Sequence, residues 1–220
     1  MRPSLSNVLL ELPRTARHLY RYFLHKPKTY PNNNIPVIVF PGFLAGDWST
    51  ALLRRYLIHK GFNAYGWHQG TNDGVSMERF KHLNEHINTL HEKHNHPVVL
   101  IGWSLGGVYA REMSRYNTKI HKVVTLASPF ANLFANHIVD LYQIINNETP
   151  STFRTMSEVV KQPINVPSLN LYTKHDGVVH WMSCFHAADD NAISKEVKAS
   201  HTGIGFEPDA LEHIVEFINS

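Results

Sequence analysis

The chain has 220 residues, of which 43% are hydrophobic and 18% are charged, an ordinary composition for a globular protein. This length predicts one domain with enough residues for a substantial core. A formal net charge of +3 is too small to indicate a nucleic-acid-binding protein, and no basic patch with interleaved aromatic residues occurs. The single cysteine, Cys184, excludes an internal disulfide, and we expect it to pack in or near the core.

The first predicted element is a basic amphipathic helix in an N-terminal extension, residues 1–34. Residues 1–28 carry six basic residues and a single acidic residue, Glu11. Apolar residues recur at helical spacing, at Leu12, Ala16, Leu19, Tyr20 and Phe23. Such a helix can bind an anionic membrane surface, but more often it packs its apolar face on its own domain, and we favour this second arrangement.

The same segment does not have the features of a signal peptide, because Glu11, Pro13, Arg14 and Arg17 interrupt any apolar stretch. No run along the chain approaches the ~18 consecutive apolar residues of a membrane-spanning helix. We therefore expect a cytoplasmic protein.

From residue 35 onward, short apolar runs alternate with helical patterns. Predicted strands cover residues 35–40, 63–67, 97–101, 120–126, 168–173 and 196–200, and predicted helices cover residues 52–60, 76–94, 107–113 and 153–161. This alternation predicts an α/β domain, residues 1–220, with a mostly parallel sheet of about six strands and helices on both faces. Residues 129–166 interrupt the alternation, because an apolar stretch is followed by a polar loop around residues 146–151 and a second short helix before the next strand.

Gly102-Trp103-Ser104-Leu105-Gly106 lies between a predicted strand and a predicted helix. A strand, G-x-S-x-G and a helix are the context of a nucleophile elbow, a tight turn that holds its serine in a strained conformation. Gly102 and Gly106 leave the space that this turn needs. The pattern predicts Ser104 as a nucleophile, and the alternative is an ordinary serine in a glycine-rich turn.

A serine at such an elbow is followed in the chain by an acid and then a histidine. Asp176 follows the predicted strand 168–173 and is the candidate acid, although Asp-Gly is also a common turn. His201 follows the last predicted strand and is the candidate general base. Asp189 and Asp190 are rival acids, which we expect to be solvated surface charges.

An oxyanion hole needs two backbone N–H groups aimed at the developing negative charge. The residue after the nucleophile, Leu105, is expected to supply one. Phe43, in the Pro41-Gly42-Phe43-Leu44 loop after the first strand, is expected to supply the other.

Taken together, these motifs resemble those of the α/β-hydrolase superfamily, in particular small bacterial serine esterases and lipases. The similarity runs from about residue 35 to the C-terminus. It is carried by residues 41–43, the elbow at Ser104, residues 126–130, 176–179 and 200–203, and by two blocks typical of one esterase/lipase subgroup, residues 47–50 and 66–72. Two departures are Pro41, where many relatives have histidine, and Trp103, where many lipases have histidine.

The resemblance implies an α/β-hydrolase fold and a serine carboxylic-ester hydrolase that needs no cofactor and acts on a small-molecule ester or lipid. It also implies that residues 129–166 form a small helical cap or lid, whereas a helix pair that completes the core is the equally open alternative. An apolar cap suits acyl chains. The residues that we expect to bind substrate are Leu44, Trp103, Phe130, Leu133 and Phe134.

Two histidines of the predicted helix 76–94 are candidates for a metal site. His82 and His86 have the spacing of a zinc-binding pair, but no glutamate follows His82, so we expect a solvated helix face and no metal.

A thioesterase, amidase or acyltransferase could use the same triad. A non-catalytic binding protein could keep the fold without turnover.

Overall fold

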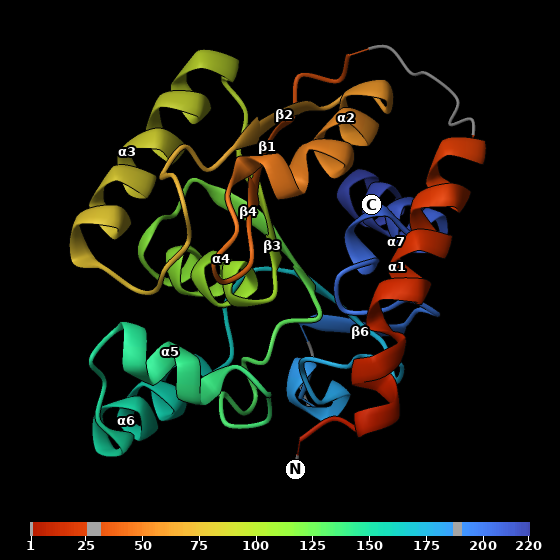
Figure 1. Cartoon of the computed structure of the whole chain (residues 1–220). Coiled ribbons are helices and arrows are strands. Elements are labelled where there is room, and N and C mark those ends of the chain that lie inside the picture. Colours follow the sequence, from red (N-terminus) through yellow and green to blue (C-terminus); the bar gives the residue numbers. More distant parts are fainter. Residues whose placement is uncertain (1, 26–31, 187–190) are drawn as a thin grey trace.

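The computed structural model of the chain describes residues 2–25, 32–186 and 191–220. At its centre lies a six-stranded parallel sheet with the strand order β2-β1-β3-β4-β5-β6 (Figure 1). The strands are β1 (Pro36–Phe40), β2 (Asn63–Gly66), β3 (Val98–Trp103), β4 (Ile120–Leu126), β5 (Ser168–Tyr172) and β6 (Ala192–Glu196). Every residue of β1 and β3 is buried, as expected for central strands covered on both faces. The predicted α/β sheet is confirmed.

Helices cover both faces of this sheet. One face packs against α1 (Leu5–Leu24), α2 (Ala51–His59) and α7 (Pro208–Asn219), and the other against α3 (Met77–His94) and α4 (Leu105–Tyr116). Three 3₁₀ helices, Asp47–Thr50, Trp181–Cys184 and Ile204–Phe206, lie in the connections. Of the helices in the described part of the chain, none combines the length and apolar character needed to cross a bilayer.

The order of the strands creates a crevice at one edge of the sheet. β1 and β3 are neighbours, yet the chain continues from β1 to β2 on one side and from β3 to β4 on the other. Ligands of open α/β sheets bind outside the carboxyl ends of strands at such a switch point. The loop that contains Phe43 leaves β1 at this place, and Ser104 follows β3.

The segment 129–166 forms α5 (Val139–Ile145) and α6 (Pro150–Val160). Figure 1 shows both helices (teal) set apart from the layers that cover the sheet. Their buried residues belong to a separate apolar cluster, which also contains Val108 of α4 and Phe130. The two helices therefore pack around a third apolar cluster, which they share with α4.

The last strand lies four residues earlier than predicted. We expected residues 196–200, but β6 spans Ala192–Glu196. β6 is an edge strand with no fully buried residue, so it lacks the apolar run that marks the central strands. Val197 and Ala199 are buried because the chain beyond the strand packs on the core. These two apolar residues gave the alternating pattern from which a strand was predicted at residues 196–200.

The N-terminal helix packs on the domain mainly with its polar face, whereas most of the apolar face that was expected to do so is exposed. The only buried residues of α1 are Glu11 and His18, whereas Leu5, Leu9 and Leu12 are 76%, 79% and 80% exposed. The surface under α1 consists largely of loop backbone, around residues 174–177 and 200–203, which offers hydrogen-bonding groups. Polar side chains therefore face inward, together with Leu19 and Tyr22, which are partly buried and pack against the core.

Candidate active site

Ser104 stands at a sharp turn between β3 and α4. Its backbone has φ 54° and ψ −121°, a strained conformation for a residue with a side chain. A Cβ added to Gly106 would lie 2.7 Å from the Pro41 carbonyl oxygen, and one added to Gly102 would overlap the backbone of Gly106. The two glycines therefore have no room for side chains, and the turn has the geometry of a nucleophile elbow.

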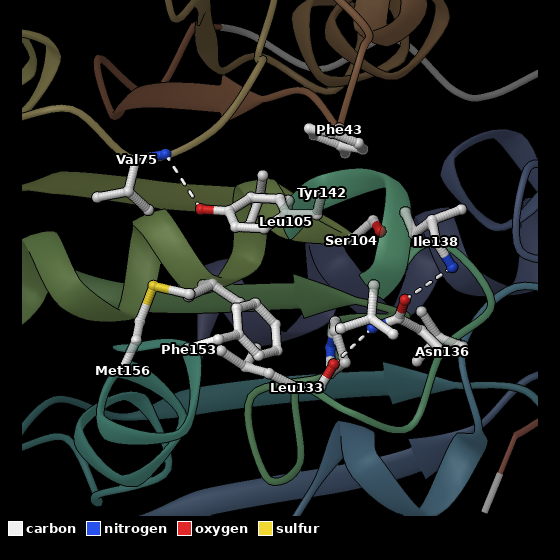
Figure 2. A pocket seen from close by; sticks show the side chains of 14 residues that line it. Phe43, Val75, Ser104, Leu105, Leu133, Asn136, Ile138, Tyr142, Phe153 and Met156 are labelled. Atoms are coloured by element: carbon white, nitrogen blue, oxygen red, sulfur yellow. Dashed lines mark hydrogen bonds between the residues drawn. The ribbon is translucent and has the colours of Figure 1, made fainter. Parts of the chain in front are cut away.

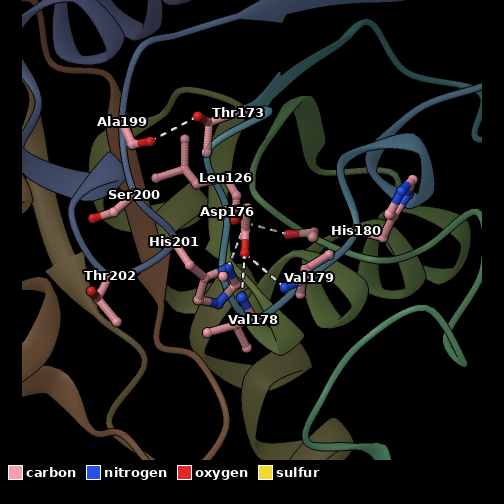
Figure 3. Close-up of polar contacts among 12 residues, drawn as sticks. Leu126, Thr173, Asp176, Val178, Val179, His180, Ala199, Ser200, His201 and Thr202 are labelled. Carbon is pink, nitrogen blue, oxygen red and sulfur yellow. Dashed lines mark hydrogen bonds and ion pairs between the residues drawn. The ribbon is translucent and has the colours of Figure 1, made fainter. Parts of the chain in front are cut away.

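Asp176 and His201 are brought together from the ends of β5 and β6. His201 Nδ1 lies 2.8 Å from Asp176 Oδ2, and both residues are buried (Figure 3). The other carboxylate oxygen, Asp176 Oδ1, accepts hydrogen bonds from the N–H groups of Val178 and Val179 at 2.8 and 2.7 Å. Because Asp176 occupies Nδ1, the Nε2 atom of His201 is the nitrogen left to exchange a proton.

His201 is also tied to the elbow through its backbone. Trp103 Nε1, on the residue before Ser104, donates to the His201 carbonyl oxygen at 2.9 Å. The side chains of Ser104 and His201 are both in the described part of the chain. No hydrogen bond joins Ser104 Oγ to His201. Catalytic hydrogen bonds are often long when no substrate is bound.

Three influences act on the pKa of His201. Burial lowers it, since desolvation penalises the imidazolium. The Asp176 carboxylate raises it through charge and hydrogen bonding, and the charge of Glu11 raises it further. The net result is a pKa above the ordinary value of 6.5.

Glu11 of α1 is the residue near the site that the sequence interpretation missed. Its Oε1 atom accepts hydrogen bonds from the N–H groups of Gly177 at 2.7 Å and His201 at 3.0 Å. Its Oε2 atom accepts from the N–H and the hydroxyl of Thr202, at 3.2 and 3.0 Å. One buried carboxylate thus holds the loop of Asp176 and the loop of His201 together. No local pattern around Glu11 signals this role, because all its partners lie more than 160 residues away.

The expected oxyanion-hole residues, Phe43 and Leu105, both lie beside Ser104 (Figure 2). Among the described residues, no backbone group accepts a hydrogen bond from either N–H. Leu105 is the first residue of α4, so its N–H has no partner within the helix. Both amides are therefore available to a ligand.

The loop of Phe43 is held by Asn72, a second residue that the sequence interpretation did not assign. Asn72 is fully buried, and its Nδ2 donates to the Pro41 carbonyl oxygen at 2.8 Å. Its backbone carbonyl accepts from the N–H of Leu44 at 2.7 Å, and its own N–H donates to the Ala45 carbonyl at 2.8 Å. These bonds fix the turn that presents the Phe43 amide.

Asp47 links the two sequence blocks that resemble an esterase/lipase subgroup. Its carboxylate accepts hydrogen bonds from the N–H groups of Trp67 at 2.9 Å and His68 at 3.1 Å. The blocks at residues 47–50 and 66–72 therefore form one unit behind the Phe43 loop. The two motifs therefore have a structural role, because Asp47 of the first holds the backbone of the second.

An apolar pocket opens above Ser104, between the elbow and the segment 129–166 (Figure 2). Its cavity volume is about 40 Å³, enough for a few water molecules. Helices α5 and α6 contribute Val139, Tyr142, Phe153 and Met156 to its walls. Burial raises the pKa of Tyr142 to about 12, so its phenol is neutral at any pH near 7.

Leu133 is the member of the expected substrate-binding set that lines this pocket. Trp103 lies below the elbow against Phe206, and Phe130 is buried under the Arg111 guanidinium. Phe134 packs edge-on against Phe153 from outside the pocket, and Leu44 is half exposed. We therefore leave these four residues out of the proposed substrate pocket.

A larger apolar groove adjoins the pocket. It runs between α3, α4 and α6 with a cavity volume of about 530 Å³. Val75, Val108 and Met156 line both cavities. These three side chains therefore lie between the small pocket at Ser104 and the much larger groove.

Other expected features fall outside the site. Cys184 is fully buried and burial raises the pKa of its thiol, as expected for a packing residue rather than a nucleophile. His82 is exposed and His86 is partly buried, and in the described residues no group of three or more His, Cys, Asp or Glu side chains could hold a metal ion. Asp189 and Asp190 lie outside the described residues.

Comparisons with known proteins show the family of this chain. Residues 68–187, more than half of the chain, match the PGAP1-like alpha/beta domain. The chain belongs to this family. The matched region of this PGAP1-like domain includes Ser104 and Asp176 and ends before His201. No curated protein sequence gives a significant match.

Solved structures similar to this PGAP1-like domain include lipases from three organisms. Lipase B of Aspergillus fumigatus has a TM-score of 0.69 at 16% identity, over 89% of this chain, which spans 56% of the lipase chain. A Bacillus licheniformis lipase in its mature form has a TM-score of 0.64 at 11% identity, over 88% of this chain and 96% of the other. The monoacylglycerol lipase of Paleococcus ferrophilus has a TM-score of 0.57 at 17% identity, over 88% and 96%. The fold is that of the α/β-hydrolase superfamily, as the sequence motifs predicted.

Proposed function

We propose that this PGAP1-like domain is a serine hydrolase that cleaves carboxylic esters with an apolar acyl group. One observation carries the proposal: Ser104 stands at a strained elbow under an apolar pocket, next to two unpartnered N–H groups, and a buried Asp176–His201 pair adjoins the elbow. Acyl transfer needs these parts in this arrangement. The lipases with the same fold support an ester as the substrate class.

The residues divide the chemistry as follows. Ser104 Oγ attacks the ester carbonyl carbon while its proton passes to His201 Nε2. The negative oxygen of the tetrahedral intermediate accepts hydrogen bonds from the N–H groups of Phe43 and Leu105. Asp176 keeps His201 in the required tautomer and stabilises the imidazolium.

Collapse of the intermediate breaks the bond to the alcohol, which leaves with the proton from His201, and the acyl group stays on Ser104. Water then attacks this acyl-enzyme while His201 accepts its proton. The second intermediate releases the carboxylic acid and restores the Ser104 hydroxyl. No cofactor takes part in these steps.

We further propose that residues 129–166 act as the cap of the acyl site within a single domain. The pocket under α5 and α6 has space for a few water molecules only, so a bound acyl group requires the side chains above Ser104 to move. Val75, Val108 and Met156 would then form the passage from this pocket to the larger groove.

Hydrolysis of p-nitrophenyl esters from acetate to palmitate tests the proposal. Turnover is expected for the wild type and should fall to background in Ser104→Ala with the fold intact. Ser114→Ala is the matched control, since this serine lies on α4, the helix that follows Ser104, and is similarly buried.

Retained turnover in Ser104→Ala would end the assignment. If no ester is cleaved, a fluorophosphonate probe separates the remaining functions. Labelling of Ser104 would indicate a thioesterase, amidase or acyltransferase, and an unlabelled folded protein would indicate a non-catalytic role.

A further inference from the structure

The outer face of α1 is apolar along the whole length of the helix. Leu5, Leu9 and Leu12 are exposed on one side at 76%, 79% and 80%, and Tyr20 and Phe23 continue the same side at 66% and 67%. The spacing of these positions, 5, 9, 12, 20 and 23, keeps them on one stripe of a helix. Exposed apolar surface of this extent marks an interaction site.

This exposure is built into the packing of the helix. The opposite face is fixed to the domain by polar contacts, among them Asn7 with the Lys174 carbonyl, Arg14 with the His175 carbonyl and Glu11 with its four donors. His18 contacts the buried carboxylate of Glu207 in the same row. A rotation of α1 that hid the leucines would break all of these contacts.

The exposed charge beside the apolar stripe is positive. Residues 1–28 contain one acidic residue, Glu11, and it is buried against the domain. Arg17 is exposed on the flank of the stripe, and Arg2 is exposed at the start of the helix, where it pairs with Asp140. The surface that α1 presents outward is therefore apolar and cationic, with no acidic residue of its own.

We propose that the outer face of α1 binds the surface of an anionic lipid bilayer, with the helix lying along the surface. Leucines and aromatic rings would enter the boundary between headgroups and acyl chains, and the arginines would contact anionic headgroups. A second copy of the chain fits this face less well, because a two-fold contact between two α1 helices would bring arginines together with no exposed acid on either helix.

The N-terminal end of α1 lies beside the cap. Arg2 pairs with Asp140 of α5, and His137 Nε2 lies 3.1 Å from the Pro3 carbonyl oxygen. In Figure 1 the start of α1 and the cap helices lie at the same end of the molecule. Next to Asp140, the cap exposes Leu141 and Ile144. A bilayer that binds α1 would therefore lie close to the cap.

Vesicle cosedimentation tests this proposal independently of ester hydrolysis, because the full-length Ser104→Ala protein can be used. Vesicles of phosphatidylglycerol and phosphatidylcholine are compared with pure phosphatidylcholine, at low and high salt. We expect binding to the anionic vesicles that weakens with salt and is at least tenfold weaker on neutral vesicles.

In this background, Leu12→Glu should reduce the affinity for anionic vesicles at least tenfold, and Phe23→Glu should do so independently. Arg17→Glu should reduce it about fivefold or more, as expected for a basic residue near a charged surface. Met77→Glu is the matched control: Met77 is 82% exposed on α3, far from α1 in Figure 1, and its replacement should leave binding unchanged.

Three results would overturn the proposal. The first is that the folded protein does not sediment with anionic vesicles. The second is that Leu12→Glu and Phe23→Glu, both folded by circular dichroism, bind like Met77→Glu. The third is a dimer by light scattering that Leu12→Glu converts to a monomer, which would assign the face to a second copy of the chain.

Discussion

The two halves of the candidate site are built in different ways. The nucleophile half, around Ser104, is shaped by close backbone packing, where Gly102 meets the backbone of Gly106 and Gly106 meets the carbonyl groups of Phe40 and Pro41. The acid–base half is held by side chains from a distant segment, chiefly the carboxylate of Glu11. The first half leaves a signature in local sequence and the second does not.

The backbone half should tolerate almost no added volume. Gly106→Val is expected to prevent folding or to destabilise the protein by several kcal/mol, because its Cβ would meet the Phe40 and Pro41 carbonyls. Thermal and urea unfolding measure the effect. Gly70→Ala is the control: Gly70 has positive φ, 69°, but open space around it, so only about 1–2 kcal/mol of backbone strain is expected. Equal effects for the two variants would contradict the role assigned to close packing.

In the acid–base half, Asp176→Asn should lower kcat by roughly 10³–10⁴-fold with little change in stability. The amide oxygen can still accept the N–H groups of Val178 and Val179, but the NH₂ group facing His201 Nδ1 would favour the wrong tautomer. Steady-state kinetics on the best ester gives the result. Asp209→Asn, at an exposed position on α7, should behave as wild type.

Glu11→Gln should lower kcat/KM by roughly tenfold or more, because the loops of Asp176 and His201 lose part of their alignment. Loss of the negative charge should also lower the pKa of His201, so the acidic limb of the pH profile should move to lower pH. Glu11→Asp, which keeps the charge, should leave that limb closer to wild type. A drop in thermal stability with an unmoved limb would assign Glu11 a merely structural role.

The pH profile of the wild type follows from the same electrostatics. His201 must be neutral to accept a proton, and Asp176 and Glu11 keep its pKa above 6.5 despite burial. Activity should therefore fall as pH decreases through a value higher than 6.5, measured as kcat/KM over pH 5–9. Tyr142, with a pKa of about 12, should contribute nothing in this range. An acidic limb below 6.5 would contradict the raised pKa.

The smallest expected effect concerns the passage between pocket and groove. Met156→Trp should shift the acyl-length optimum to shorter esters and leave acetate hydrolysis within about twofold, because the larger side chain narrows the passage. Thr155→Trp, exposed on the same helix, is the control. An unchanged chain-length profile would place the acyl group elsewhere.

Much of the fold could be predicted because its signals are local. Buried parallel strands such as β1 and β3 appear as continuous apolar runs, and the two glycines around Ser104 mark the elbow. The order of Ser104, Asp176 and His201 along the chain follows the order of the strand ends that carry them.

The remaining features depend on contacts that no local pattern records. Glu11 and Asn72 look like ordinary polar residues until their partners are known. The apolar stripe of α1 predicts a buried face, but the surface that the helix meets is largely loop backbone, so most of the stripe faces outward. Trp103 and Phe130 were expected to bind substrate, yet Trp103 Nε1 donates to the His201 carbonyl oxygen and Phe130 packs under the Arg111 guanidinium.

The contacts of Glu11 also have a consequence for synthesis of the chain. Its partners are 166, 190 and 191 residues further along, and His18 and Arg21 likewise meet Glu207. Helix α1 therefore stays without its binding surface until the residues up to Glu207 have been translated, with its leucines exposed in the meantime. Assembly of the acid–base half is expected to be a late event in folding, after the sheet around Ser104 has formed.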